Sequence, residues 1–334
     1  MVCAKPMIGI TMGDAFGVGP EVLLSAMAEN KIAEVCNPII IGDYNILKYV
    51  NGVIKSSYEL KKIFDIGEAK FESRIINVID LANMNIEQFK KGIKSSIFCE
   101  AFLESTEKAI SLVMANKIDA IIGCPYLNET VNLARSEVEV YDYPSYVAKI
   151  LDQQVFLMLL NGDLRVCNIT LHVPMRVACD LITREVVLKT IKIVNDTVQE
   201  LGVPKPNLAV SSLNAHAGNT GSYGWEEIEE IEPAIKEARN LGINVTGPLS
   251  GDDFLKDILA EKHNAYIGMY HDQTYSVLKL FKNKNLYSGL ILGAPIIFAI
   301  AGQGSGLDSP FRNIVFSRTL TQTIESVLKL LKTR

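Results

Sequence analysis

Short runs rich in β-branched residues alternate with segments of helical periodicity along the whole chain. The runs are Ile8–Ile10, Ile39–Ile41, Ile75–Ile79, Ala120–Ile122, Asn168–Leu171, Leu208–Val210, Tyr266–Met269 and Leu290–Leu292. Strands that are buried on both faces read as continuous apolar runs, and strands separated by helices usually pair in parallel. The alternation therefore predicts an α/β fold with a mostly parallel sheet.

The helices between these strands are predicted from apolar residues at helical spacing. We expect long helices over about 94–116, over Arg184–Gly202 and over Thr319–Thr333. A chain of 334 residues exceeds the usual size of one domain, so two domains are expected. No repeat or Gly/Ser linker marks a boundary, and we place it near Pro125. The first domain then comprises residues 1–125 plus about 290–334, and the second comprises 126–289.

Composition excludes several classes of partner. A net charge of -5 leaves no basic field for a nucleic acid. The amino-terminal residues carry no signal-peptide pattern, and the longest stretch without a polar side chain, Gly289–Gly302, is broken by Pro295 and is too short to cross a bilayer. Six cysteines occur without a C-x-x-C pair, which fits a reducing compartment. We expect a soluble cytoplasmic protein with no nucleic-acid or membrane partner.

Three of the four histidines follow strand-like runs: His172, His216 and His271. Ligands of α/β sheets bind at the carboxyl ends of strands, so three imidazoles there are predicted to hold one divalent cation with open positions for substrate. Asp252 is a candidate fourth ligand or an orienting carboxylate. Each histidine taken alone is equally consistent with a buried or surface position, and only their shared placement favours the metal. His263 lies in a charged stretch and is expected to be a solvated surface residue.

The segments around these histidines resemble those of the 4-hydroxythreonine-4-phosphate dehydrogenase (PdxA) family. They read His172-Val173-Pro174-Met175, Asn214-Ala215-His216-Ala217-Gly218 and Tyr270-His271-Asp272-Gln273. The stretch from Thr11 to Glu21, the Glu-rich stretch Glu226–Ala234 and the segment Thr246–Leu249 are also similar to family segments, so the resemblance covers nearly the whole chain.

The resemblance implies a fold like that of isocitrate and isopropylmalate dehydrogenases, with two α/β/α domains and the active site in the cleft between them. It also implies a homodimer whose metal site is shared across the subunit interface, with the second domain carrying the metal histidines. The implied reaction is NAD-dependent oxidation of a secondary alcohol in a hydroxy acid, followed by β-decarboxylation. The metal would be Zn, Mg, Mn or Co.

Further roles follow from the resemblance. Lys279 is assigned to substrate binding or proton transfer. Asp252 is also assigned a catalytic role. A solvated helix position is the commoner fate of a lysine. The substrate is expected to contact Asp14, in a glycine-rich turn, together with Asn128 and Tyr143. That turn could equally be a tight structural connection between a strand and a helix. The dinucleotide is expected to contact Gly293, Gln303, Gly304 and Asp308.

The chain departs from the family pattern at several of these positions. Asn128 stands where the family has lysine, Asp142–Tyr146 lacks the family's histidine and threonine, and Phe298 replaces an arginine. A phosphate would lose charged partners at these positions, so we expect an altered, less anionic substrate, which could be bulkier or aromatic. The cofactor loop at 302–313 loses two of the family's glycines and gains Arg312, which leaves NAD and NADP both open.

Three functions are therefore weighed. The leading one is a metal- and NAD(P)-dependent dehydrogenase acting on a hydroxy acid. The alternative is a metal-dependent lyase or decarboxylase on the same scaffold that no longer uses NAD, and the third is a non-catalytic small-molecule binding protein. Retention of His172, His216, His271 and Lys279 favours the first, and the changed cofactor loop favours the second.

Overall fold

A computed structural model describes residues 5–28, 31–127, 129–135, 140, 142–280, 287–302 and 317–334. The chain divides into two compact units, each described here by itself. Unit 1 comprises residues 1–150, 285–288 and 295–332, and unit 2 comprises residues 151–284, 289–294 and 333–334. The first boundary therefore follows Ile150 and not Pro125.

The reason for this shift lies in the segment after the fifth strand. Helix α5 (Thr130–Ala134) packs against α4 (Ser96–Met114). Helix α6 (Tyr143–Leu151) is joined to the same helix by a hydrogen bond of 2.8 Å between the hydroxyls of Tyr143 and Thr106. Residues that the sequence pattern assigned to the second domain thus complete the first.

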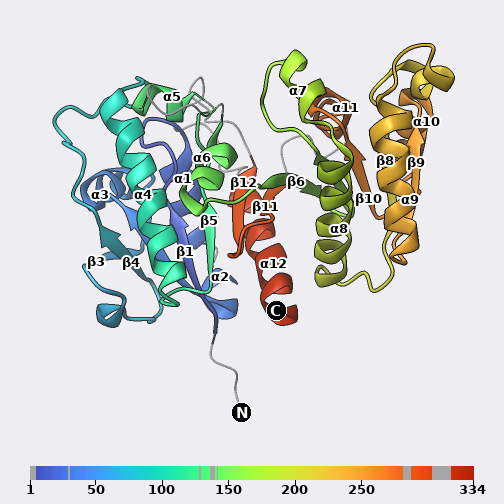
Figure 1. The fold of residues 1–334 in the computed structure, drawn as a ribbon. Coiled ribbons are helices and arrows are strands. Elements are labelled where there is room, and N and C mark those ends of the chain that lie inside the picture. Colours follow the sequence, from blue (N-terminus) through green and yellow to red (C-terminus); the bar gives the residue numbers. More distant parts are fainter. Residues whose placement is uncertain are drawn as a thin grey trace. The chain divides into compact units, whose positions relative to one another are not determined.

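Unit 1 is built on six strands in the order β3-β4-β2-β1-β5-β12. They are β1 (Met7–Thr11), β2 (Asn37–Gly42), β3 (Glu59–Ile63), β4 (Ile75–Asp80), β5 (Ala120–Gly123) and β12 (Phe298–Gly302). The pairings along this order are parallel, with Ile10 opposite both Ile40 and Ile122. The remaining helices of the unit are α1 (Gly19–Met27), α2 (Lys31–Val35), α3 (Tyr44–Val53), the 3-10 turn η1 (Ile66–Glu68) and α12 (Ser317–Thr333). Helix α4 packs on β1, β2 and β5 (Figure 1).

Unit 2 has the strand order β11-β6-β7-β10-β8-β9. These are β6 (Phe156–Asn161), β7 (Leu164–Asn168), β8 (Asn207–Ser211), β9 (Asn244–Leu249), β10 (Ala265–Gly268) and β11 (Tyr287–Leu292), of which β11 belongs mostly to this unit. Strands β7, β10, β8 and β9 pair in parallel, and β6 runs antiparallel to β7. The helical elements are α7 (Met175–Leu181), α8 (Arg184–Glu200), η2 (Ala215–Gly221), the π-helix η3 (Glu227–Ile231), α9 (Glu232–Asn240), α10 (Gly251–Leu259) and α11 (His271–Leu278).

The predicted α/β fold and the three predicted long helices are confirmed by α4, α8 and α12. Helix α8 begins where the Thr183 side chain accepts a hydrogen bond from the Val186 N–H, and it ends before Gly202, whose φ of +100° stops the helix. The strand predicted over Asn168–Leu171 is placed too late in the sequence, because β7 ends at Asn168. Strands β3, β6, β9 and β12 were not predicted.

The cysteines and the helices bear on the remaining expectations from composition. Cys36, Cys99, Cys124, Cys167 and Cys179 are free thiols, and the first four are buried. Among the residues that the structure describes, no helix has the length and apolar character that a membrane span requires.

Candidate functional site

Two of the strand-end histidines of unit 2 lie side by side. His172 follows β7 and His271 is the first residue of α11, just after β10, and these two strands are neighbours in the sheet. Their ring centroids are 5.1 Å apart and the ring planes are tilted by 48°. Both side chains are partly accessible, with 32% of the His271 side chain exposed. This is the arrangement in which two imidazoles can share one ion.

A carboxylate orients one of the two rings. The Nδ1 atom of His271 lies 2.8 Å from Oδ1 of Asp272. When Nδ1 carries the proton and donates a hydrogen bond to Asp272, Nε2 keeps its lone pair for a cation, and metal-binding histidines are commonly oriented by a carboxylate in this way. The same hydrogen bond holds the pKa of Asp272 below its ordinary value.

Side chains of α11 also join the three strand ends to one another. The Gln273 side chain accepts a hydrogen bond from the Met269 N–H at 2.7 Å and donates one to the Ser212 carbonyl at 2.8 Å, so it connects the end of β10 to the end of β8. The Thr274 hydroxyl donates to Asn168 Oδ1 at 2.7 Å, at the end of β7. Gln273 is part of the Tyr270–Gln273 motif, but sequence reasoning gave neither it nor Thr274 a role.

The third histidine is placed differently. His216 lies in η2, beyond β8, with an exposed side chain whose ring centroid is 6.2 Å from that of Tyr223. Among the described residues, which include all four histidines, no three His, Cys, Asp or Glu side chains are close enough to hold a metal ion. The structure therefore brings together two of the three predicted ligands, and His216 stands apart from them in the loop after β8.

That loop has an unusual backbone. Five successive residues, His216 to Thr220, have φ between 42° and 72°. Four of them are not glycine, and each such residue costs roughly 1–2 kcal/mol in the left-handed region. Gly218 is required on packing grounds as well, because a Cβ there would lie 2.6 Å from Oε2 of Glu227.

Asp252 and Lys279 both occupy exposed positions. Asp252 is in the first turn of α10, a helix that packs against η2, the element that carries His216. Lys279 follows the last residue of α11, so it is at the opposite end of that helix from His271. Their catalytic roles stay predictions.

Two of the substrate residues predicted in unit 1, Asp14 and Tyr143, are buried. Asp14 is fully inaccessible, and its carboxylate accepts hydrogen bonds from the Leu127 N–H and from the Thr130 hydroxyl, the latter at 3.1 Å. Burial raises the pKa of Asp14 to about 7, against the lowering effect of these hydrogen bonds. A Cβ at Gly13 would lie 2.3 Å from the Pro125 carbonyl, so this glycine permits the close approach of the two loops. These contacts favour the structural interpretation of the glycine-rich turn.

Tyr143 is part of an aromatic cluster inside unit 1. Its ring is fully buried and lies 4.9 Å from Phe102, 4.6 Å from Tyr126 and 5.9 Å from Phe298, measured between centroids. A side chain packed in this way has no free face for substrate, so its position corrects the expectation that Tyr143 contacts substrate. Phe298, which stands where the family has an arginine, is buried in the same cluster.

The predicted dinucleotide residues lie largely outside the described part of the chain. Gln303, Gly304 and Asp308 are among the residues not described, as is Asn128 in the substrate set. Gly293 is described, with φ of +87°, and a Cβ there would meet the Gln154 carbonyl at 2.7 Å. This contact alone accounts for glycine at position 293.

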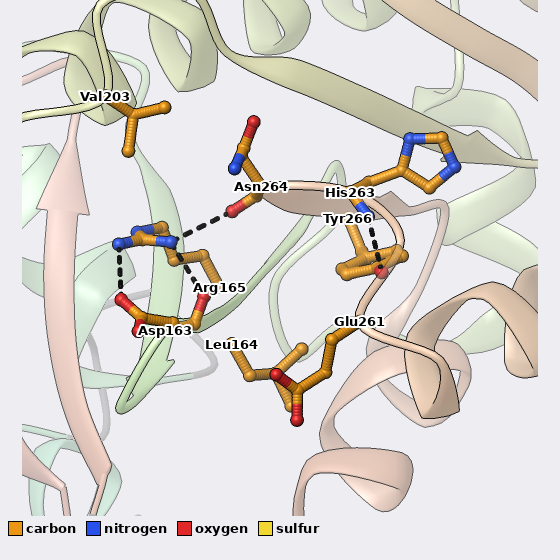
Figure 2. Close-up of a pocket in the computed structure, with 8 residues that line it drawn as sticks. All are labelled: Asp163, Leu164, Arg165, Val203, Glu261, His263, Asn264 and Tyr266. Atoms are coloured by element: carbon orange, nitrogen blue, oxygen red, sulfur yellow. Dashed lines mark hydrogen bonds and ion pairs between the residues drawn. The ribbon is translucent and has the colours of Figure 1, made fainter.

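A cavity of about 250 Å³ lies in unit 2 at the amino ends of the strands, opposite to the ends that the histidines follow (Figure 2). Arg165 crosses it and donates hydrogen bonds to the carbonyls of Asp163 and Asn264 at 2.7 and 3.2 Å. The lining residues stand at the amino ends of β7 and β10, whereas ligands of α/β sheets bind at the carboxyl ends.

His263, beside this cavity, corrects another expectation, because it is buried and not solvated. Its Nε2 atom lies 3.1 Å from Oδ2 of Asp257, and its ring points away from Arg165 in Figure 2.

Comparison with known proteins agrees with this fold. The model of the pyridoxal phosphate biosynthetic protein PdxA family matches residues 34–327. The chain belongs to the PdxA family. It is 32% identical over 309 residues to a Clostridium botulinum protein named as a D-threonate 4-phosphate dehydrogenase, with 92% of each chain covered.

Solved structures of the family have the same fold. The 4-hydroxythreonine-4-phosphate dehydrogenase of Burkholderia phymatum superposes with a TM-score of 0.77 at 29% identity, covering 98% of each chain. The Klebsiella pneumoniae enzyme of that name gives 0.80 at 26% identity, covering 98% of this chain and all of the other. The prediction that the chain belongs to a family of dehydrogenases with a mixed α/β fold is confirmed.

Proposed function

We propose that this PdxA-family protein is a divalent-metal-dependent, NAD(P)-linked dehydrogenase that oxidises the secondary alcohol of a hydroxy acid and then decarboxylates the product. The observation that carries the proposal is the pair His172 and His271, 5.1 Å apart at neighbouring strand ends, with Asp272 on Nδ1 of His271. Two accessible imidazoles, one of them oriented by a carboxylate, are a suitable start for a catalytic metal site with open positions.

The donor chemistry fits a borderline metal. Imidazole nitrogens suit zinc or cobalt better than magnesium, so these are the preferred candidates among Zn, Mg, Mn and Co. When bound, such an ion lowers the pKa of a substrate hydroxyl and polarises the carbonyl formed from it. We place His216 in the same site on the strength of the family resemblance.

Lys279 and Asp252 are proposed to act on the substrate. A helix of eight residues rises roughly 12 Å, so Lys279 at the end of α11 serves a part of the substrate distant from the His271 end. Its ammonium group is suited to binding a carboxylate or to delivering a proton after carbon dioxide leaves. Asp252 lies in the first turn of α10, beside the element that carries His216. It is proposed as a further metal ligand or as a carboxylate that orients a ligand.

We propose a substrate that is less anionic than 4-phosphohydroxythreonine. The aromatic cluster of unit 1 supports this, because buried Phe298 and Tyr143 leave no cationic side chain where the family pattern has groups that bind substrate. Steady-state rates with D-threonate 4-phosphate and with unphosphorylated hydroxy acids test this point. A higher kcat/KM for the phosphorylated acid contradicts it.

A homodimer is proposed from the surface of unit 2. Large apolar side chains are exposed on α7, around η3 and on α10, namely Met175, Leu181, Tyr223, Trp225, Ile228 and Leu259. Such side chains suit an interface between subunits better than contact with water. Light scattering after size-exclusion chromatography measures the mass, and a monomer at micromolar concentration contradicts the proposal. The cytoplasmic location stays a prediction.

Calorimetric titration of NAD and of NADP into the Co²⁺-loaded protein tests the cofactor. Saturable binding of either dinucleotide supports the dehydrogenase, and the preferred one shows how the changed loop at 302–313 is used. Binding of Co²⁺ without binding of either dinucleotide contradicts it and favours a metal-dependent lyase or decarboxylase.

A further inference from the structure

The left-handed segment from His216 to Thr220 is held by one buried carboxylate, that of Glu227. Glu227, the first residue of η3, has no exposed surface. Its Oε1 atom accepts hydrogen bonds from the N–H groups of Leu213 and Asn214 at 2.8 and 2.7 Å, and its Oε2 atom accepts one from the Asn214 side chain at 2.9 Å. These three donors belong to the two residues that immediately precede η2.

The glycine at the centre of the segment shows that the carboxylate lies within the turn. A Cβ on Gly218 would be 2.6 Å from Oε2 of Glu227 and 3.2 Å from the Gly224 carbonyl. The Tyr223 N–H returns to the Gly218 carbonyl at 3.1 Å and closes the loop around this point. Glu227 therefore fills the interior of the loop on whose outer side His216 is exposed.

The neighbouring glutamate contributes much less. Glu226 accepts one hydrogen bond from the Asn214 side chain at 2.7 Å and is only partly buried. The two adjacent carboxylates thus share Asn214 as a donor, but the backbone hydrogen bonds of Glu226 come from its own N–H and that of Trp225, whereas Glu227 takes the N–H groups of Leu213 and Asn214 that lead into η2. This difference gives a matched pair of positions for an experiment.

We infer that Glu227 is a positioning residue for His216, holding the loop after β8 in the left-handed conformation that presents this imidazole. The inference rests on the proposed function in that His216 is taken as a ligand of the divalent ion. Loss of the carboxylate leaves two backbone donors without their acceptor, so the loop relaxes toward ordinary φ values and the imidazole loses its fixed position. The strand pairing of β8 with β9 and β10 does not depend on Glu227.

The test compares Glu227→Ala and Glu227→Gln with the control Glu226→Gln in the full-length protein. Amide hydrogen exchange over residues 212–224 measures the loop, and calorimetric titration with Co²⁺ alone measures the metal site. We expect faster exchange in this loop and Co²⁺ binding weakened by about 10–100-fold in Glu227→Ala, as for loss of a group that orients a metal ligand. Glu226→Gln should match the parent protein in both measurements.

Glu227→Gln keeps the volume and can still accept from the two backbone N–H groups, but its amide faces the Asn214 amide, donor to donor. It should fold as the parent does and show a smaller loss of Co²⁺ affinity than Glu227→Ala. Both variants are compared well below their melting temperatures, so that global unfolding does not contribute.

The outcomes separate this inference from the proposed function. A parent protein that binds Co²⁺, with variants at Glu227 that bind it equally well, overturns the positioning role alone. Unchanged exchange in the loop also overturns it. A parent protein that binds no Co²⁺ removes the metal site itself, and with it this role of Glu227.

Discussion

The two units place polar side chains at equivalent points of their sheets but use them differently. In unit 1, Asp14, Asp43 and Asp80 follow or end β1, β2 and β4, and all three are buried with backbone N–H groups as donors. In unit 2, His172 and His271 follow β7 and β10 and stay partly accessible. A carboxylate that accepts backbone hydrogen bonds in the interior stabilises loops, whereas a solvent-accessible imidazole can be reached by a ligand.

The largest effect is expected at an accessible histidine of unit 2. His271→Ala should abolish activity and weaken Co²⁺ binding by roughly 100-fold, since a complete ligand set supplies about 10–16 kcal/mol and one ligand a fraction of it. The unfolding free energy should change by less than about 0.5 kcal/mol, because 32% of the side chain is exposed and it lies outside the core. Calorimetry with Co²⁺ and urea denaturation measure the two quantities.

His263→Ala is the control for that experiment, because it removes the same kind of side chain from a buried position. It should lower the unfolding free energy and leave the Co²⁺ affinity unchanged. If His271→Ala binds Co²⁺ as the parent does, the accessible histidines of unit 2 do not form the metal site, and the difference between the units is not a functional one.

The next largest effect is expected at a buried carboxylate of unit 1, Asp14, and it depends on pH. Unfolded Asp14 titrates near 3.8 and burial raises its pKa in the folded protein to about 7. The folded protein therefore binds more protons between these values, so the contribution of Asp14 to stability is present at low pH and is lost as the pH rises toward 7. The unfolding free energy of Asp14→Asn minus that of the parent should increase by about 2–4 kcal/mol from about pH 4 to about pH 7.5.

Urea denaturation of both proteins across this pH range gives the measurement. A difference that does not change with pH would show that the carboxyl group of Asp14 titrates alike in the folded and unfolded chains. It would also weaken the structural role given to the glycine-rich turn.

A smaller effect is expected where unit 2 orients its accessible ring. Asp272→Asn keeps an oxygen that can accept from Nδ1 of His271 but removes the charge. We expect Co²⁺ affinity to fall by about 10-fold, at the lower end of the effects of losing a group that orients a metal ligand, because Asp272 is largely exposed. An unchanged affinity would mean that the 2.8 Å contact does not fix the ring when metal is bound.

The smallest effect is expected at Tyr143. Tyr143→Phe removes the hydroxyl that meets Thr106 at 2.8 Å, and Thr106 keeps its hydrogen bond to the Phe102 carbonyl, so the unfolding free energy should fall by only about 1 kcal/mol. KM should stay at the parent value, since the ring has no accessible face. A large rise in KM with unchanged kcat would restore Tyr143 as a substrate contact.

Local sequence patterns determined the α/β class, the positions of α4, α8 and α12, and the presence of histidines just after strands in unit 2. Such patterns depend on the periods of strands and helices, which a few neighbouring residues establish. The family was also recognisable from motifs around the histidines, since those motifs are contiguous in the chain.

Only the tertiary structure decided which polar side chains are accessible. Asp14 is buried by Leu127 and Thr130, which are 113 and 116 residues away, and His263 is buried against Asp257 although its sequence neighbours are charged. His216 lies in a left-handed loop built around Glu227, a conformation that residue preferences alone disfavour. Burial and side-chain direction are set by contacts between distant segments, and no local period encodes them.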